Sequence, residues 1–180
     1  MTGIVGVVLA GGAGTRLGGA KPGASLAGHP LLSYPLAALS AVLEEVAVVA
    51  KADTDLPPVG DGVLIWREPD EPRHPLAGVV EALRRAEGRA VIVLACDLPL
   101  VTGELVRALA EADAQGAPAV VATTSARGLQ PLCARYDPAG RMITQVQALA
   151  PATISVDPRL LRNVNSAEDL AAVERDLSRT

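Results

Sequence analysis

Three segments carry residues that could do chemistry, and the first two of them come directly after predicted strands. The first runs over residues 9–32 and begins LAGGAGTRLGGAK, so a glycine-rich stretch follows an apolar strand. Glycines let backbone amides approach a ligand closely, and successive amides form a cradle for an anion. Arg16 and Lys21 add cations just downstream. This combination predicts a phosphate site, and the alternative is an ordinary glycine-rich turn with solvated cations.

The second segment is ACDLPLV, residues 95–101, in which Asp97 directly follows an apolar strand. In an open α/β sheet, ligands bind beyond the carboxyl ends of the strands, so this carboxylate faces the same crevice as the glycine-rich loop. Its predicted task is to hold Mg²⁺, which uses a few carboxylates together with phosphate oxygens and water. The alternative is a turn or capping residue before Pro99. Cys96 is expected to be a packed thiol, because no histidine or cation lies near it in the sequence.

The third segment is LRNVNSAEDLAAVE, residues 161–174. Asn163 and Asn165 flank one valine, so on an extended segment both amides point to one face, where they could bind phosphate or sugar hydroxyls. The alternative is that both satisfy backbone groups ahead of a helix that begins at Ser166. Ser166 and Asp169 have the approximate spacing of a capping box at the start of this last helix.

The elements that must position these segments alternate between apolar β-branched runs and helical patterns. Strands are predicted over residues 4–10, 46–50, 63–66, 90–95, 119–123, 131–136 and 153–156, and helices over 31–43, 76–87, 102–115 and 141–149. Strands separated by helices imply a parallel or mixed sheet that is covered on both faces. We therefore predict one α/β domain over residues 1–180, a three-layer α/β/α sandwich with a Rossmann-like, mixed and mostly parallel sheet.

Composition excludes several classes of function. The 180 residues carry a formal net charge of −4, and only 2% are aromatic. An acidic chain is poorly suited to coating nucleic-acid phosphates, and so few rings cannot form a base-stacking platform. The N-terminal apolar run of about seven residues is too short for a secretory signal or a membrane span. We expect a cytoplasmic protein that binds neither nucleic acid nor membrane.

Together the segments resemble the molybdenum cofactor guanylyltransferase family, within the nucleotidyltransferases that carry a LAGG loop. The matching motifs run in the family's order over nearly the whole chain, at residues 9–12, 16–18, 21, 28–31, 75–78, 96–99, 130–134 and 163–170. The LAGG loop with its arginine and lysine defines only the wider class, whereas QPLCA together with NVN narrows it towards the molybdopterin members. The resemblance implies the fold of the nucleotide-diphospho-sugar transferases.

The same resemblance implies a Mg²⁺-dependent enzyme that transfers GMP from GTP to molybdopterin and releases pyrophosphate. The residues implied to bind the nucleotide are Leu9, Ala10, Gly11, Gly12, Gly14, Arg16, Lys21, Glu68 and Asp97. The implied catalytic residues are Arg16, Lys21 and Asp97, of which Asp97 is also the metal ligand, and Gln130, Asn163 and Asn165 are implied on the molybdopterin side. Transient contact with molybdopterin-synthesis or molybdoenzyme proteins is a further implication.

Three positions depart from the family's pattern. Ala20 stands where an aspartate commonly precedes the lysine, and His74 stands where a glycine commonly precedes PLAG. Glu68 is the nearest equivalent of an aspartate that is thought to contact the base. These departures leave two alternatives open. One is another nucleotidyltransferase of the class, specific for a cytidylyl donor or a sugar-phosphate acceptor, and the other is an accessory protein that binds nucleotide or cofactor without catalysis.

Overall fold

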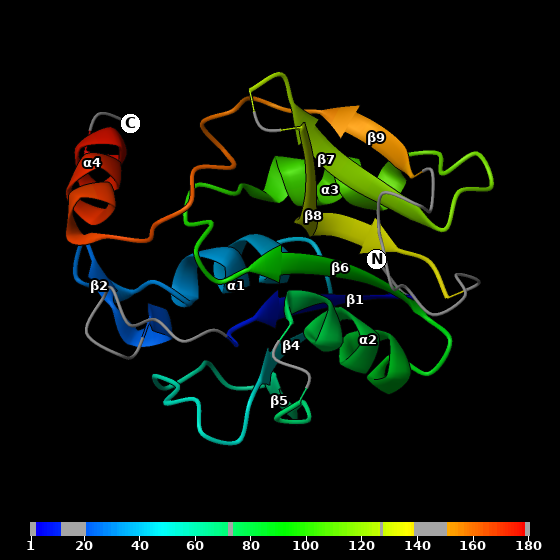
Figure 1. The fold of residues 1–180 in the computed structure, drawn as a ribbon, viewed down its shortest axis with the longest axis horizontal. Helices are drawn as coiled ribbons and strands as arrows, with labels where there is room; N and C mark the ends of the chain where they lie inside the picture. Colours follow the sequence, from blue (N-terminus) through cyan, green and yellow to red (C-terminus); the bar gives the residue numbers. More distant parts are fainter. Residues whose placement is uncertain (1–2, 12–20, 72–73, 127, 139–150, 179–180) are drawn as a thin grey trace.

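Seven strands form one sheet in the computed structural model, which describes residues 3–11, 21–71, 74–126, 128–138 and 151–178 (Figure 1). In chain order they are β1 (Ile4–Leu9), β4 (Glu45–Ala50), β5 (Leu64–Arg67), β6 (Ala90–Ala95), β7 (Ala119–Thr124), β8 (Gly128–Tyr136) and β9 (Ala152–Ser155). Their order across the sheet is β5-β4-β1-β6-β8-β7-β9. β8 runs antiparallel to both of its neighbours, and the other neighbouring strands pair in parallel. The predicted mixed and mostly parallel sheet is confirmed.

Helices cover both faces of this sheet (Figure 1). They are α1 (Ser33–Ser40), α2 (Pro75–Arg85), α3 (Gly103–Glu111) and α4 (Ala167–Leu177). α1 and α3 share one buried cluster with alternate strand residues such as Val8, and α2 shares the opposite cluster with residues such as Val7. This division follows from the two-residue repeat of a strand, which sends successive side chains to opposite faces. The three-layer sandwich predicted from the sequence is confirmed.

A glycine in β1, an interior strand, lets α1 lie directly on the sheet. A Cβ added at Gly6 would come 3.0 Å from Leu43 Cδ1 and 3.1 Å from Leu39 Cβ. Glycine inside a strand often marks such a close approach of a neighbouring element. The apolar run that predicted a buried strand therefore also contains the residue that admits the covering helix.

The prediction that the third helix extends to Gln115 is wrong, because α3 ends at Glu111. Arg135 of β8 places its Nη1 between 2.8 and 2.9 Å from the carbonyl oxygens of Leu109, Ala110 and Ala112. The last carbonyls of a helix lack partners within the helix, and a cation there also opposes the helix dipole. A buried arginine from β8 thus ends the helix, and Gly116, which has a φ of +80°, lies in the following turn.

A short hairpin that the sequence did not predict lies within the first segment, after Lys21. The 3₁₀ turn η2 (Lys21–Gly23) leads into β2 (Ser25–Leu26) and β3 (His29–Pro30). The turn between them has Ala27 and Gly28 at φ +48° and +84°, as in two-residue hairpin loops with two left-handed positions. α4 packs on this hairpin through a separate cluster formed by Leu26, Leu31, Val164 and Val173 (Figure 1).

The predicted helix over residues 141–149 lies outside the described residues. Among the helices that the structure does describe, none has the length and apolar composition needed to cross a membrane.

Candidate active site

The carboxyl ends of β1, β4, β5 and β6 lie at one edge of the sheet, and a charged residue follows each of the last three. β1 leads towards Gly11, β4 into Lys51, β5 into Glu68, and β6 through Cys96 into Asp97. This is the edge at which open α/β sheets bind their ligands. The parallel neighbours β1 and β6 therefore bring Gly11 and Asp97 to the same edge, while most of the glycine-rich loop, residues 12–20, lies outside the described residues.

Lys21 joins one residue from each of the other two segments. Its Nζ donates hydrogen bonds to Asp97 Oδ2 at 2.8 Å and to Asn165 Oδ1 at 2.7 Å. The side chains of Lys21 and Asp97 are only 17% and 15% exposed, so water screens this ion pair less than it would a surface pair. An ammonium carries three protons, so these two bonds leave one N–H without a partner among the described residues and able to meet a ligand. The structure thus assembles a fixed cation from residues that are 76 and 144 positions apart in the sequence.

Asp97 has a second oxygen that fits a metal ion. Its Oδ1 is buried and has no hydrogen-bond partner among the described residues. Buried polar atoms are normally satisfied, so an unpaired carboxylate oxygen at a ligand-binding edge indicates a missing partner. Mg²⁺ prefers oxygen ligands and completes its shell with phosphate oxygens and water, so one protein carboxylate is enough. The described ranges contain no cluster of three or more His, Cys, Asp or Glu side chains that could hold a metal ion.

A second lysine–carboxylate pair lies on the other side of β1. Lys51 Nζ is 3.6 Å from Glu68 Oε1 and donates to the carbonyl oxygen of Pro69 at 2.7 Å. Burial raises the pKa of Glu68, and the Lys51 cation opposes this effect. Glu68 Oε2, like Asp97 Oδ1, is buried without a partner among the described residues. Lys51 was not predicted as a site residue, although it directly follows a buried strand, which is the signal that singled out Asp97.

The two lysine–carboxylate pairs contain both lysines of the sequence. Both lie at this edge, and each stands beside a carboxylate that retains one unpaired oxygen. In the sheet order, β6 lies on one side of β1 and β4 and β5 lie on the other. This edge of the sheet therefore offers cations for phosphate and two carboxylate oxygens as acceptors. The two lysine–carboxylate pairs lie on opposite sides of β1, the strand that leads into the glycine-rich loop.

Gly11 is needed because Glu68 occupies the space of a side chain there. A Cβ at position 11 would lie 2.6 Å from Glu68 Oε1, closer than real Cβ contacts allow. Glu68 cannot swing away freely, because its side chain is 6% exposed and paired with Lys51. The close approach therefore fixes where the chain leaves β1 and enters the loop.

We expect Gly11→Ala to destabilise the protein by about 1–3 kcal/mol, the usual cost of overpacking, and to raise the KM for nucleotide several-fold. Thermal unfolding and nucleotide titration measure the two effects. Gly60→Ala is the matched control, because no described atom lies within 4 Å of a Cβ at that position. Equal effects of the two substitutions would show that the contact between Glu68 and Gly11 does not constrain the loop.

Two residues beside the motifs have structural roles. Burial raises the pKa of the Cys96 thiol to about 12, so the thiol stays protonated and the prediction of a packed cysteine is confirmed. His74 is the N-cap of α2, where its Nδ1 accepts a hydrogen bond from the Leu76 backbone N–H at 3.2 Å. This cap gives a local reason for a histidine where the family commonly has glycine.

The structure does not bring every predicted residue to the lysine. Gln130 lies in β8, and its Nε2 donates to the carbonyl oxygen of Gly128 at 3.3 Å. Asn163 is partly buried two residues before Asn165. Gly12, Gly14, Arg16 and Ala20 lie outside the described residues. The roles assigned to these residues remain predictions.

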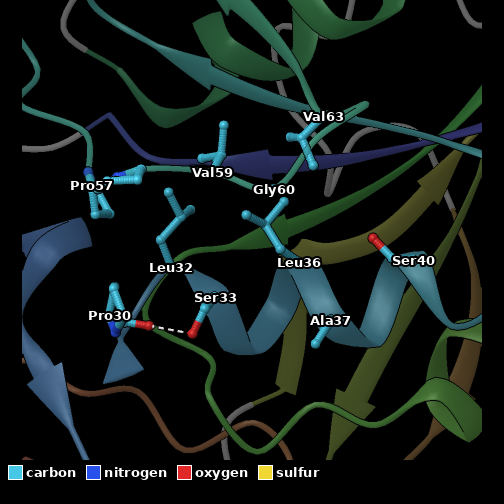
Figure 2. A pocket seen from close by; sticks show the side chains of 11 residues that line it. Pro30, Leu32, Ser33, Leu36, Ala37, Ser40, Pro57, Val59, Gly60 and Val63 are labelled. Carbon is cyan, nitrogen blue, oxygen red and sulfur yellow. Dashed lines mark hydrogen bonds between the residues drawn. The ribbon is translucent and has the colours of Figure 1, made fainter. Parts of the chain in front are cut away.

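A groove elsewhere on the molecule offers no comparable chemistry. It has a volume of about 220 Å³ and lies between α1 and the loop that connects β4 to β5 (Figure 2). Its lining includes Leu32, Leu36 and Val63 and contains no charged side chain. The lysine–carboxylate edge is therefore the stronger candidate for the active site.

The mixed sheet carries a partly buried lysine–carboxylate pair at the edge where open α/β sheets bind their ligands, which suits an α/β domain that binds a nucleotide. The family model described as "MobA-like NTP transferase domain" matches residues 6–167. The chain therefore belongs to the MobA-like NTP transferase family. Membership of a nucleotidyltransferase family indicates the use of a divalent metal ion.

Individual relatives agree with this assignment. The chain is 32% identical over 187 residues to the molybdenum cofactor guanylyltransferase of Cereibacter sphaeroides, and the match covers 95% of each chain. Its fold is similar to that of molybdopterin-guanine dinucleotide biosynthesis protein A from Archaeoglobus fulgidus, with a TM-score of 0.74, 21% identity and coverage of 98% and 100% of the two chains. The fold of 2-C-methyl-D-erythritol 4-phosphate cytidylyltransferase from Thermus thermophilus is also similar, with a TM-score of 0.67, 21% identity and coverage of 97% and 98%.

Proposed function

We propose that this chain is a molybdenum cofactor guanylyltransferase, which transfers GMP from GTP to molybdopterin and releases pyrophosphate. The observation that carries this proposal is Lys21, held between Asp97 and Asn165 at the carboxyl edge of the sheet. Family membership and the named activity of the Cereibacter relative support GTP and molybdopterin as the substrates.

In the proposed reaction, an oxygen of the terminal phosphate of molybdopterin attacks the α-phosphorus of GTP. A new P–O bond forms while the bond to the β-phosphate oxygen breaks, and its electron pair leaves with pyrophosphate. The nucleophile is already an anion, so the protein needs no general base. Catalysis then depends on positioning and on electrostatic stabilisation. The third N–H of Lys21 stabilises the charge on the α-phosphate, while Asp97 Oδ2 and Asn165 Oδ1 hold the ammonium in place.

The remaining site residues have proposed roles in binding. Asp97 Oδ1 would hold Mg²⁺, which when bound neutralises charge on the phosphate oxygens. The backbone amides of the glycine-rich loop, together with Arg16, bind the triphosphate. Gln130 and Asn163 line the molybdopterin side, and contact with molybdopterin-synthesis or molybdoenzyme proteins belongs to the same proposal.

Glu68 is proposed to select guanine. Its buried Oε2 is an acceptor, and guanine presents two adjacent donors, N1–H and the 2-amino group. Glu68 follows β5, but its side chain reaches back over β4 to the end of β1, where Oε1 lies 2.6 Å from the Cβ position of Gly11. A carboxylate on the β4–β5 side of β1 is therefore placed for the base when Lys21 and Asp97 bind the phosphates.

Pyrophosphate release with GTP, ITP, ATP and CTP, each with and without molybdopterin, tests the proposal. We expect release only with a purine nucleotide that carries N1–H, and ITP, which lacks the 2-amino group, to be about tenfold less efficient than GTP. Glu68→Gln should remove most of this preference for GTP over ITP. A preference for CTP would establish the cytidylyl alternative, and nucleotide binding without release would establish the accessory protein.

A further inference from the structure

The start of α4 carries a hydrogen-bond network that extends beyond the helix cap. Asp169 Oδ2 accepts hydrogen bonds from the Ser166 backbone N–H and from Ser166 Oγ, both at 3.0 Å, and Ser166 Oγ accepts from the Asp169 N–H at 3.2 Å. These contacts form a capping box. The same Oδ2 also accepts the backbone N–H of Asn165 at 2.9 Å, which the cap itself does not require. These bonds lower the pKa of Asp169, the one from Asn165 contributing most.

The additional bond fixes the residue whose side chain holds the lysine. Asn165 is exposed, so tight packing does not determine its conformation. Its backbone is held on both sides, because the Val164 N–H donates to the Asp97 carbonyl oxygen at 2.9 Å and the Asn165 N–H donates to Asp169. Because the backbone is already restricted, the Asn165 residue loses less conformational entropy when its Oδ1 accepts a hydrogen bond from Lys21.

We propose that Asp169 is a positioning residue for Lys21, acting through Asn165. The continuous path of hydrogen bonds runs from the Asp169 carboxylate to Asn165, then to the lysine ammonium, and ends at Asp97. The inference rests on the proposed function for the catalytic role of the lysine. Asp97 and Asn165 already provide two acceptors for Lys21, so an aspartate at position 20 is not needed to hold the lysine, and alanine can stand there.

Kinetics of matched variants test the proposal. Asp169→Ala should lower kcat about fivefold to tenfold with a smaller change in the KM for GTP, because misplaced catalytic groups act mainly on the chemical step. Asp169→Glu should restore most of the rate, since glutamate is the common residue at this position of a capping box. Glu168→Ala, which removes the same charge from the same helical turn, should leave kcat unchanged. Equal losses in Asp169→Ala and Glu168→Ala would overturn the proposal.

A double-mutant cycle separates positioning from general destabilisation. In an Asn165→Ala protein, Asp169→Ala should reduce kcat by less than about twofold further, because the path to Lys21 is already broken. If the losses from the two substitutions multiply fully, Asp169 does not act through Asn165.

A readout independent of turnover uses the two lysines of the chain. An amine-reactive reagent, with labelling followed by mass spectrometry, should modify Lys21 about fivefold faster in Asp169→Ala than in the wild type, because a released side chain is more accessible. Lys51 serves as the internal control and should be unaffected. Faster labelling of both lysines, or of neither, would overturn the proposal. If the wild type releases no pyrophosphate from any nucleotide, the proposed function fails, while the labelling still tests the positioning.

Discussion

Asp97→Asn should lower the kcat of nucleotidyl transfer by at least ~100-fold, or about 3 kcal/mol in the barrier, in a protein that remains folded. Asparagine has nearly the same shape, but it lacks the charge that pairs with Lys21 and the anionic oxygen offered to a metal ion. Both carboxylate oxygens of Asp97 have a role. Oδ2 accepts from Lys21, and Oδ1, which is buried with no partner among the described residues, is available to a ligand. One substitution therefore weakens the lysine's position and the metal site together.

Steady-state pyrophosphate release measures this effect, and thermal unfolding checks the fold. Asp157→Asn is a suitable control, because Asp157 Oδ1 accepts a backbone hydrogen bond from Arg159 at 2.9 Å on an exposed loop. Titration with Mg²⁺ adds a second readout, since loss of a direct ligand should raise the concentration needed for half-maximal rate. Near-normal turnover of a folded Asp97→Asn protein would rule out the assigned role.

Local patterns were sufficient to predict much of the site. Buried parallel strands are nearly continuous apolar runs, so their ends are visible in the sequence, and a polar residue at such an end lies at the ligand-binding edge. This reasoning identified Asp97 directly, and the capping-box spacing located the start of α4 at Ser166. The hydrogen bond between Lys21 and Asp97 was not itself predicted, although the parallel pairing of β1 and β6 brings the two segments to the same edge.

Other features depend on partners that are distant in the sequence. Arg135 ends α3 from a strand more than twenty residues later, so the helix pattern alone carried no signal of it. The pairing of Lys51 with Glu68 required knowing that β4 and β5 are neighbours. The sequence left two readings of Asn165, a ligand contact or a backbone bond ahead of the helix. The structure shows a third, because its side chain accepts from Lys21.

Lys21→Ala should lower kcat about 100-fold or more with little change in the KM for GTP, whereas Arg16→Ala should mainly raise that KM. The planar guanidinium of an arginine suits bidentate hydrogen bonding to phosphates in the ground state. The compact ammonium of a lysine can stabilise charge that develops only during transfer. Two acceptors hold the Lys21 ammonium, so its position is fixed before the reaction begins. For the same reason Ala20→Asp should leave kcat unchanged.

Initial rates over a range of GTP concentrations separate the effects of Lys21→Ala and Arg16→Ala on kcat and KM. Arg175→Ala, which removes an exposed charge on α4, is the control. If Lys21→Ala retains the wild-type kcat, the ammonium does not act on the transferred phosphate, and its bonds to Asp97 and Asn165 serve only the fold.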